Sequence, residues 1–414
     1  MLSDQLLEAR QRTQALTQDL DGEQLFGPKL AIVNPVLWEL GHVAWFQERW
    51  CLRLRPDESL SPSLLEGSDG LYDSAKVAHD TRWDLPLPDL SATLDYQERV
   101  LERVLERLAR GADDPWFLYF VQLVIFHEDM HAEAFHYTRQ TLGYPDPLES
   151  GSSTGGEDDL RGDAEIAGGT HMIGALRRTG FHFDNEKWMH AVEVEPFRIA
   201  KAPVTNAEFL EFVRESGYGR REWWSHDGWA SKGEAQGPRY WRKRDGEWLE
   251  RRFSAWVPLD PELPVMHVDW HEAKAYCRYA KRRLPSEAEW EIAASLDAAG
   301  AKRRYPWGDA SEAGRANLGG SGRVPVGRFA AGDSALGCRQ MIGNVWEWTS
   351  SAFEPYPGFV ADPYREYSEP WFGTHKVLRG GSFSTPGRLV ASSWRNFYLP
   401  DRGDVFAGFR TAAP

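Results

Sequence analysis

Apolar residues in the first 146 positions recur at steps of three and four, a period that predicts amphipathic helices. Each of four such segments begins or ends at a residue typical of a helix boundary. We expect helices over residues 3–20 with Ser3 as N-cap, from Asn34-Pro35 onward, from Ser91 to Gly111, and after Pro115. Four amphipathic helices in a segment of this length predict a four-helix bundle, whose core is a common place for a metal site.

The third predicted helix has the clearest apolar stripe. We expect its buried face to consist of Leu94, Leu101, Val104, Leu105 and Leu108. The segment before it, from Pro56 to Pro88, is rich in Ser, Asp, Gly and Pro and predicts a long connection.

The fourth predicted helix contains the stretch FVQLVIFHEDMHAEAFH, residues 120–136. Its core-facing stripe begins with apolar side chains and continues with His127 and His131, which lie one helical turn apart. Two histidines at this spacing can bind one metal ion, and they are equally consistent with a hydrogen-bonded pair in the core. Glu128 and Glu133 lie off the stripe, so we expect them to support the ligands or to face solvent.

A third histidine changes the balance between these two interpretations. His42 lies on the inward face of the second helix, between Trp38 and Trp45. Burying three imidazoles without partners would cost about 1–3 kcal/mol each, and one divalent metal would satisfy all of them. Three nitrogen ligands leave coordination positions open and fit Fe(II), Zn(II), Ni(II) or Cu(II).

The composition changes after the predicted bundle. Residues 147–163, PLESGSSTGGEDDLRGD, are almost free of apolar side chains and predict an acidic linker. Residues 164–414 contain short strand-like runs broken by Gly, Pro and Trp, with expected helices at 206–215, 271–280 and 285–294. The chain is therefore predicted to be α+β, with a helical domain at 1–146, a linker at 147–163 and a loop-rich domain at 164–414.

Charge and targeting signals narrow the class of protein. The formal net charge of −14 argues against nucleic acid or an anionic membrane as a partner. No apolar run reaches the roughly 18–20 residues that cross a bilayer, and the N-terminus does not have the pattern of a signal peptide, so we expect a cytoplasmic protein. Cys51, Cys277 and Cys338 are scattered, which favours three buried thiols over a disulfide framework.

Motifs in both halves resemble known families. NPVLWELGHVAWF (residues 34–46) and FHEDMHAE (126–133) resemble a DinB-type bundle. The second half resembles the formylglycine-generating-enzyme domain, a C-type-lectin-like fold, through PVTNAEFLEFV (203–213), residues 264–294, YPWGD (305–309), GNVWEWTSS (343–351), VLRGGSF (377–383) and GFR (408–410). The region after GGS lacks the copper-binding cysteines of those enzymes, which argues against cysteine-to-formylglycine oxidation.

The combination of both domains is typical of the ergothioneine-pathway sulfoxide synthases and the related selenoneine synthases. This resemblance implies an Fe(II), O2-dependent enzyme that attaches sulfur or selenium to the imidazole C2 of hercynine, the trimethylated betaine of histidine. It assigns the iron to His42, His127 and His131. It also implies that hercynine is bound near Arg395, Asn396 and Phe397, with Asn396 on its carboxylate and Phe397 facing its trimethylammonium group.

Four positions depart from the sulfoxide synthase pattern. Met130 replaces a glutamine expected to touch hercynine, and Arg82 is the only arginine where those enzymes carry several for a thiol substrate. Tyr398 stands where an acid is expected. The family also uses an active-site tyrosine near the iron, for which the candidates are Tyr356, Tyr364, Tyr367 and Tyr398, with Phe359 as the alternative occupant of that position. A binding region poor in cations favours a neutral donor such as a 1-seleno-sugar.

We therefore expect C–Se bond formation of the selenoneine synthase type. The alternatives are a hercynine sulfoxide synthase that uses cysteine or γ-glutamylcysteine, a DinB-type thiol transferase with Zn(II) or Ni(II) on the same histidines, and a module that only binds carbohydrate or a partner.

Overall fold

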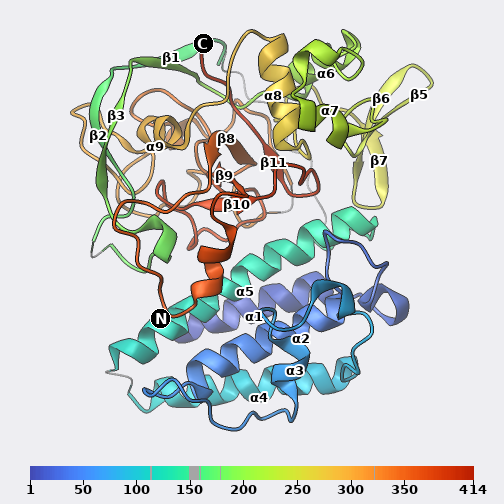
Figure 1. Ribbon diagram of the computed structural model, residues 1–414, viewed down its shortest axis with the longest axis vertical. Coiled ribbons are helices and arrows are strands. Elements are labelled where there is room, and N and C mark those ends of the chain that lie inside the picture. Colours follow the sequence, from blue (N-terminus) through green and yellow to red (C-terminus); the bar gives the residue numbers. More distant parts are fainter. Residues whose placement is uncertain (112–113, 149–157, 159, 178, 321) are drawn as a thin grey trace. The chain divides into compact units, whose positions relative to one another are not determined.

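The computed structural model describes residues 1–111, 114–148, 158, 160–177, 179–320 and 322–414. The chain divides into two compact units, Met1–Leu148 and Glu149–Pro414. This division falls inside the predicted linker 147–163, of which residues 149–157 and 159 lie outside the described part of the chain. Each unit is described below by itself (Figure 1).

The N-terminal unit is helical. Its helices are α1 (Leu2–Thr17), α2 (Val36–Glu48), α3 (Ser68–Tyr72), α4 (Leu90–Ala109) and α5 (Pro115–Leu142). A π-helical turn, Arg49–Arg53, continues α2, and short 3-10 turns lie at Gly22–Leu25 and His79–Thr81. The long helices α1, α2, α4 and α5 lie side by side (Figure 1), which confirms the predicted four-helix bundle.

The helix starts differ from the predicted ones by one or two residues. Helix α1 begins at Leu2 with Met1, not Ser3, at the N-cap, and α2 begins at Val36 with Pro35 at the N-cap. The carboxylate of Asp89 caps α4 by accepting a hydrogen bond from the backbone N–H of Ala92, 2.9 Å away. An aspartate two positions upstream thus takes the role predicted for Ser91, because it satisfies the same free N–H groups.

The predicted stripe of α4 is wrong in part. The buried face is Thr93, Tyr96, Gln97, Val100 and Val104, and Leu94 is 37% exposed. Two polar side chains on this face have partners inside the bundle: the Tyr96 hydroxyl donates to Glu48 at 2.7 Å, and the Gln97 amide donates to the Leu40 carbonyl at 2.8 Å. These bonds offset the cost of burying polar atoms, and Leu94 instead lines a groove of about 490 Å³ between α1 and α4.

The C-terminal unit combines short helices with small sheets. Its helices are α6 (Asn206–Arg214), α7 (His226–Lys232), α8 (Trp270–Tyr279) and α9 (Glu287–Ser295). Helix α9 has the capping box expected from the sequence, in which Ser286 and Glu289 bond to each other's backbone N–H groups. The three helices predicted for this half are α6, α8 and α9.

Four sheets are found in the described residues of this unit. The largest has the strand order β10-β9-β8-β11, and β11 runs parallel to β8 whereas the other pairs are antiparallel. Its strands are β8 (Trp346–Ala352), β9 (Lys376–Arg379), β10 (Asn396–Tyr398) and β11 (Ala407–Gly408). The smaller sheets are formed by β1 (Asp163–Ile166) with β4 (Phe197–Ala200), β2 (Gly169–Ile173) with β3 (His190–Val194), and β5 (Trp241–Arg244), β6 (Glu247–Arg252) and β7 (Ala255–Pro258).

The last residues of the chain are part of the core of this unit. The Arg410 guanidinium is fully buried and donates to both carboxylate oxygens of Glu347, at 2.6 and 2.7 Å. It also donates to the carbonyl of Ala200, while Ala412 forms bridges with Ile199 and Arg283. Segments far apart in the sequence therefore meet around this arginine, and the α+β class is confirmed.

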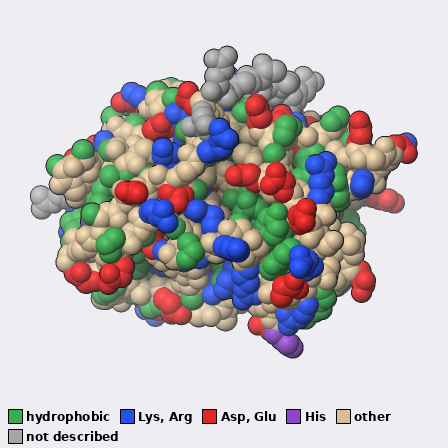
Figure 2. All heavy atoms as spheres, turned by 90° about the horizontal axis from the view of Figure 1, so that it is seen from above, with side chains coloured by type: hydrophobic (Ala, Val, Ile, Leu, Met, Phe, Trp, Pro, Cys, Tyr) green, Lys and Arg blue, Asp and Glu red, His purple; other side chains and the backbone are tan. Residues whose placement is uncertain are grey.

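Other predicted properties can be compared with the structure. The three cysteines are buried and free, so the prediction of buried thiols is confirmed. No helix in the described part of the chain is both long enough and apolar enough to cross a membrane. On the face drawn in Figure 2, Lys and Arg side chains are interspersed with Asp and Glu.

Candidate active site

Three histidines of the N-terminal unit meet in the bundle core. His42 comes from the middle of α2, and His127 and His131 come from successive turns of α5. Each offers one ring nitrogen to a cluster in which these atoms lie within 4.8 Å of one another. The apolar stripe of α5 positions the pair, since Phe117, Phe120 and Val124 on the same stripe are all buried. The sequence analysis predicted this grouping.

Bonds on the far side of two rings fix which nitrogen faces the cluster. The His42 Nδ1 lies 2.8 Å from the carbonyl of Tyr72, and the His131 Nδ1 lies 2.6 Å from a carboxylate oxygen of Glu39. Both Nδ1 atoms are therefore occupied, which leaves Nε2 as the ligand atom. The Nε2 atoms of His127 and His131 face each other at 3.2 Å.

Aromatic rings hold the cluster in place. The Trp38 ring stacks on His42 with centroids 4.9 Å apart, and Phe46 stacks on His127 at 3.6 Å. Burial, reinforced by the neighbouring imidazoles, lowers the pKa of His42 and His127 well below the usual value. Neutral imidazoles do not have to lose a proton before they bind a metal.

The three nitrogens fit a first-row divalent metal. Their convergence, with an acceptor behind two of the rings, is the arrangement that metal-binding histidines show. Three protein ligands leave positions for small molecules. Glu128 is buried and faces α1, not the histidine cluster. It accepts hydrogen bonds from Arg10 at 2.7 Å and from Thr13 at 3.1 Å, and these bonds connect α5 to α1.

Arg82 lies next to this cluster. Its guanidinium carbon sits 3.9 Å from the centre of the Trp38 ring, the ring that stacks on His42. The side chain is buried and donates to Asn34 at 2.6 Å, while its Nε finds no partner among the described residues. Burial lowers the pKa of Arg82 to about 10. Met130 is half-buried on α5, between the two histidines of that helix.

Two residues predicted to bind hercynine, Asn396 and Phe397, lie on strand β10 of the C-terminal unit together with the catalytic candidate Tyr398. Asn396, Phe397 and Tyr398 pair in register with Leu378, Val377 and Lys376. Because side chains alternate along a strand, Asn396 and Tyr398 share one face and Phe397 lies on the other. The Asn396 carbonyl oxygen accepts from the Phe397 N–H at 2.8 Å, and its amide nitrogen makes no hydrogen bond with described residues.

Phe397 and Phe359 belong to one cluster of rings. Phe397 stacks on Phe353 at 4.0 Å, Phe353 contacts Phe372 at 4.8 Å, and Phe372 meets Phe359 edge-on at 5.2 Å. The structure thus brings together two residues that the resemblance assigned separately. Tyr398 is not part of this cluster, because it lies on the opposite face of β10.

Arg395 supports the same region from inside the fold. It is 1% exposed and donates to both carboxylate oxygens of Glu287, at 2.6 and 3.0 Å, and to the carbonyls of Asn185 and Glu354. Its guanidinium also lies over the rings of Phe353 and Tyr356. The guanidinium is engaged within the protein, so these bonds do not support the predicted contact between Arg395 and substrate.

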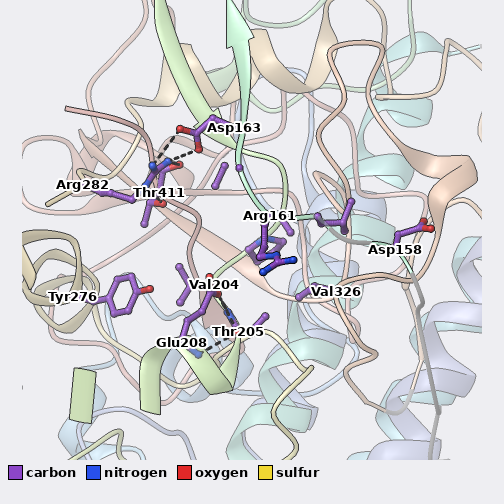
Figure 3. Close-up of a pocket in the computed structure, with 15 residues that line it drawn as sticks. Asp158, Arg161, Asp163, Val204, Thr205, Glu208, Tyr276, Arg282, Val326 and Thr411 are labelled. Carbon is purple, nitrogen blue, oxygen red and sulfur yellow. Dashed lines mark hydrogen bonds and ion pairs between the residues drawn. The ribbon is translucent and has the colours of Figure 1, made fainter. Parts of the chain in front are cut away.

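A separate cavity of about 530 Å³ lies in the C-terminal unit (Figure 3). Its charged side chains are largely paired: Arg282 binds Asp163 through two bonds, and Glu208 caps α6 with Thr205. Tyr276 extends its ring toward the cavity. The described residues that line it include no histidine or cysteine, so they offer no imidazole or thiolate ligand for a metal.

Comparison with known protein families agrees with this architecture. The DinB superfamily matches residues 5–135, and the sulfatase-modifying factor enzyme 1-like domain matches residues 154–414. The fold and the site therefore define a class of protein in which a DinB-type bundle carrying three clustered histidines precedes a sulfatase-modifying-factor domain.

Individual relatives extend over both domains. The chain is 38% identical to the hercynine oxygenase of Mycolicibacterium smegmatis, over 99% of this chain and 98% of that protein. It is 37% identical to the hercynine oxygenase of Mycobacterium tuberculosis, over 98% and 97%. The formylglycine-generating enzyme of Streptomyces coelicolor is 33% identical but matches only 61% of this chain. The chain belongs to the hercynine oxygenase family.

Sequence reasoning missed the residues behind the histidines. Glu39 precedes His42 by three positions on the same helix, so a search for acids at i−3 could have found it. The Tyr72 carbonyl carries no sequence signal, because any residue has one. Tyr72 itself lies in the stretch 56–88, which was predicted as a connection and contains α3.

Proposed function

We propose that this protein is a non-heme Fe(II) enzyme that uses O2 to form a carbon–chalcogen bond at the imidazole C2 of hercynine. The observation that carries the proposal is the cluster of His42, His127 and His131, with Glu39 and the Tyr72 carbonyl behind two of the rings. Ferrous iron held there would supply the one-electron chemistry that activates O2. Membership in the hercynine oxygenase family supports hercynine as the substrate.

The chain's own residues would bind and orient the substrate. The unused amide nitrogen of Asn396 is a suitable donor to the hercynine carboxylate. The ring of Phe397 suits the trimethylammonium group, since a quaternary cation is attracted to aromatic faces. Phe397 and Asn396 lie on opposite faces of β10, and both hercynine groups are attached to the same carbon, so contact with both residues would require hercynine to lie across the open edge of this strand. Holding the imidazole against the chalcogen donor would lower the entropic part of the barrier.

We assign selenium as the transferred atom, with a 1-seleno-sugar as donor. The support is the sequence: Met130 stands where sulfoxide synthases often have a glutamine, and the stretch that carries several arginines in those enzymes has only Arg82. A site with few cations suits a neutral sugar.

One observation favours sulfur instead. Arg82 is buried beside Trp38 and His42, makes no ion pair within the described residues, and keeps one N–H without a partner. A buried guanidinium of this kind is a good ligand for a carboxylate. A thiol donor such as γ-glutamylcysteine would provide one, so sulfoxide formation is the second candidate function.

The two donors can be compared directly. Purified Fe(II)-loaded protein is incubated with hercynine, O2 and either a 1-seleno-sugar or γ-glutamylcysteine, and the products are identified by mass spectrometry. A selenium-containing hercynine product supports our assignment; a sulfoxide product with the thiol alone contradicts it. Arg82→Met should raise the KM for γ-glutamylcysteine and leave the KM for the seleno-sugar unchanged.

Metal analysis tests the proposal against a transferase. A DinB-type thiol transferase would be active with zinc or nickel and without O2, whereas our proposal requires iron and oxygen uptake coupled to product. His127→Ala should abolish turnover, with Phe135→Leu on the same helix as a control for packing. Full activity of His127→Ala would favour a module that only binds.

A further inference from the structure

Two lysines converge on one indole ring in the C-terminal unit. Trp270 is the first residue of α8, is only 9% exposed, and is fixed by a 2.8 Å hydrogen bond from its Nε1 to the Thr349 carbonyl. The Nζ of Lys274, one turn further along α8, lies 4.5 Å from the ring centre. The Nζ of Lys376, the first residue of β9, lies 4.6 Å from the same centre.

Neither ammonium group has a counterion. In the described part of the chain, Lys274 and Lys376 form no ion pair and no hydrogen bond, although both are half-buried. Glu354 is exposed, and its negative charge raises the pKa of Lys376 without an ion pair between the two side chains. Burial lowers the pKa of both lysines, and for Lys274 the neighbouring positive charges of Arg278 and Lys376 lower it further. Such a pair of like charges is unfavourable without an anion.

The imidazole of His271, next to Trp270 on α8, also has a ring nitrogen without a hydrogen-bond partner among the described residues. His271 is the second residue of α8, and its Nδ1 is buried with no hydrogen-bond partner among the described residues. Burial lowers its pKa, and Lys274 and Lys376 lower it further, against the effect of Asp227 and Asp401. Both of these acids are exposed.

Cation–π attraction alone does not account for the arrangement. A single ammonium on an indole gains about 0.5–2 kcal/mol, and Lys232 provides an example, with its Nζ 4.4 Å from the centre of the Trp229 ring. Lys232 is also half-buried, but its Nζ donates a hydrogen bond to the Gly233 carbonyl at 2.8 Å. At Trp270 a second ammonium adds repulsion that stacking does not relieve.

We propose that Lys274 and Lys376, together with His271, form a binding site for a small oxyanion, a carboxylate or a phosphate, against the indole of Trp270. The two ammonium groups supply charge from two different elements. The observations behind this site do not involve the histidine cluster.

The register of the sheet suggests one source for such an anion. Lys376 lies directly opposite Tyr398, and these two side chains share the sheet face that also carries Asn396. A substrate carboxylate on this face is one source, and free phosphate is the other. Only the first of them rests on the proposed function.

Lysine labelling in the full-length protein tests the site. The protein is treated with limiting trinitrobenzenesulfonate at constant ionic strength, with chloride alone, with inorganic phosphate, or with hercynine, which has no primary amine to consume the reagent, and labelled peptides are quantified by mass spectrometry. We expect Lys274 and Lys376 to react early and to be protected at least fivefold by one probe, while Lys232 is not protected. Protection by phosphate identifies a free oxyanion; protection by hercynine alone identifies a substrate carboxylate.

Variants provide a second readout. Calorimetric titration with the protecting probe should show at least tenfold weaker binding for Lys274→Met and for Lys376→Met, and unchanged binding for Lys232→Met. Methionine keeps the apolar stem and removes the charge, so we expect both variants to fold. If neither probe protects these lysines in the native chain, or if both variants bind the probe normally, the proposal is wrong.

Discussion

The Glu39 carboxylate lies 2.6 Å from the Nδ1 of His131, and both residues belong to the bundle that carries the histidine cluster. This pair links α2 to α5 through the ring that is expected to bind the metal. Glu39 is 1% exposed, so its interaction with His131 is shielded from solvent.

We predict that Glu39→Gln weakens metal binding about 10- to 100-fold, because the ring loses the charged acceptor that orients it. Competition with a chelator measures the dissociation constant. Glu48→Gln is the matched control: Glu48 is also buried on α2, but it bonds to Tyr96, Ser63 and the Leu64 N–H. Equal metal affinities of the two variants would contradict a supporting role for Glu39.

Gly41 lets the Tyr72 side chain pack against α2. A Cβ at position 41 would lie 2.2 Å from the Tyr72 ring, which is fully buried. We predict that Gly41→Ala lowers the free energy of unfolding by about 1–3 kcal/mol and weakens metal binding by moving the Tyr72 carbonyl away from His42. Gly70→Ala, where nothing lies within 4 Å, should be neutral or slightly stabilising. Thermal unfolding of the metal-free proteins compares them.

The cysteines should be inert in the native state. Burial raises the pKa of Cys277 to about 12 and that of Cys338 to about 11, and it raises the pKa of Cys51 as well. At pH 8 the thiolate is therefore scarce and sheltered. Iodoacetamide should label none of the three in the native protein and all three after denaturation, as counted by mass spectrometry. Rapid labelling of the native protein would show that one of them is exposed.

A buried pair of acids should make the C-terminal unit less stable as pH rises. Burial raises the pKa of Asp269 to about 7, and the charge of Asp401 raises it further. Burial raises the pKa of Glu272 to about 8, and the charge of Asp269 raises it further. Acids with raised folded pKa values stabilise the fold at low pH, and this stability is lost as pH increases from about 4 to 8. Glu272→Gln should therefore gain thermal stability relative to the natural chain between pH 5 and 8.

Glu289→Gln is the matched control for that experiment. Glu289 occupies the same capping-box position on α9, but although burial raises its pKa, the bonds from Arg283 and Ser286 lower it overall. Glu289→Gln should be less stable than the natural chain at neutral pH. At low pH its thermal stability should approach that of the natural chain. If thermal stability depended on pH in the same way for both variants, the raised pKa values of Asp269 and Glu272 would be contradicted.

The grouping of the three histidines could be predicted from the sequence because it depends on helical periodicity. His42, His127 and His131 repeat in phase with buried apolar side chains. The stripe of α4 could not be predicted in the same way, because Tyr96 and Gln97 are buried only through partners on α2. A pattern that counts only apolar positions does not identify polar residues that are buried through tertiary hydrogen bonds.

Other features depend on register between distant segments. The proximity of Lys274 and Lys376 follows from how β9 packs beside α8, and nothing near either lysine in the sequence indicates it. The family resemblance singled out Asn396 and Phe397 as substrate-binding residues. Only the pairing of β10 with β9 shows that the two side chains lie on opposite faces of the strand.

The burial of Arg410 has a consequence for synthesis of the chain. Its guanidinium joins Glu347 to the backbone at Ala200, and β11 lies directly before it. The C-terminal unit therefore cannot complete its core during translation until residues 407–412 have emerged from the ribosome. The N-terminal bundle is a compact unit of residues 1–148, so it can fold earlier.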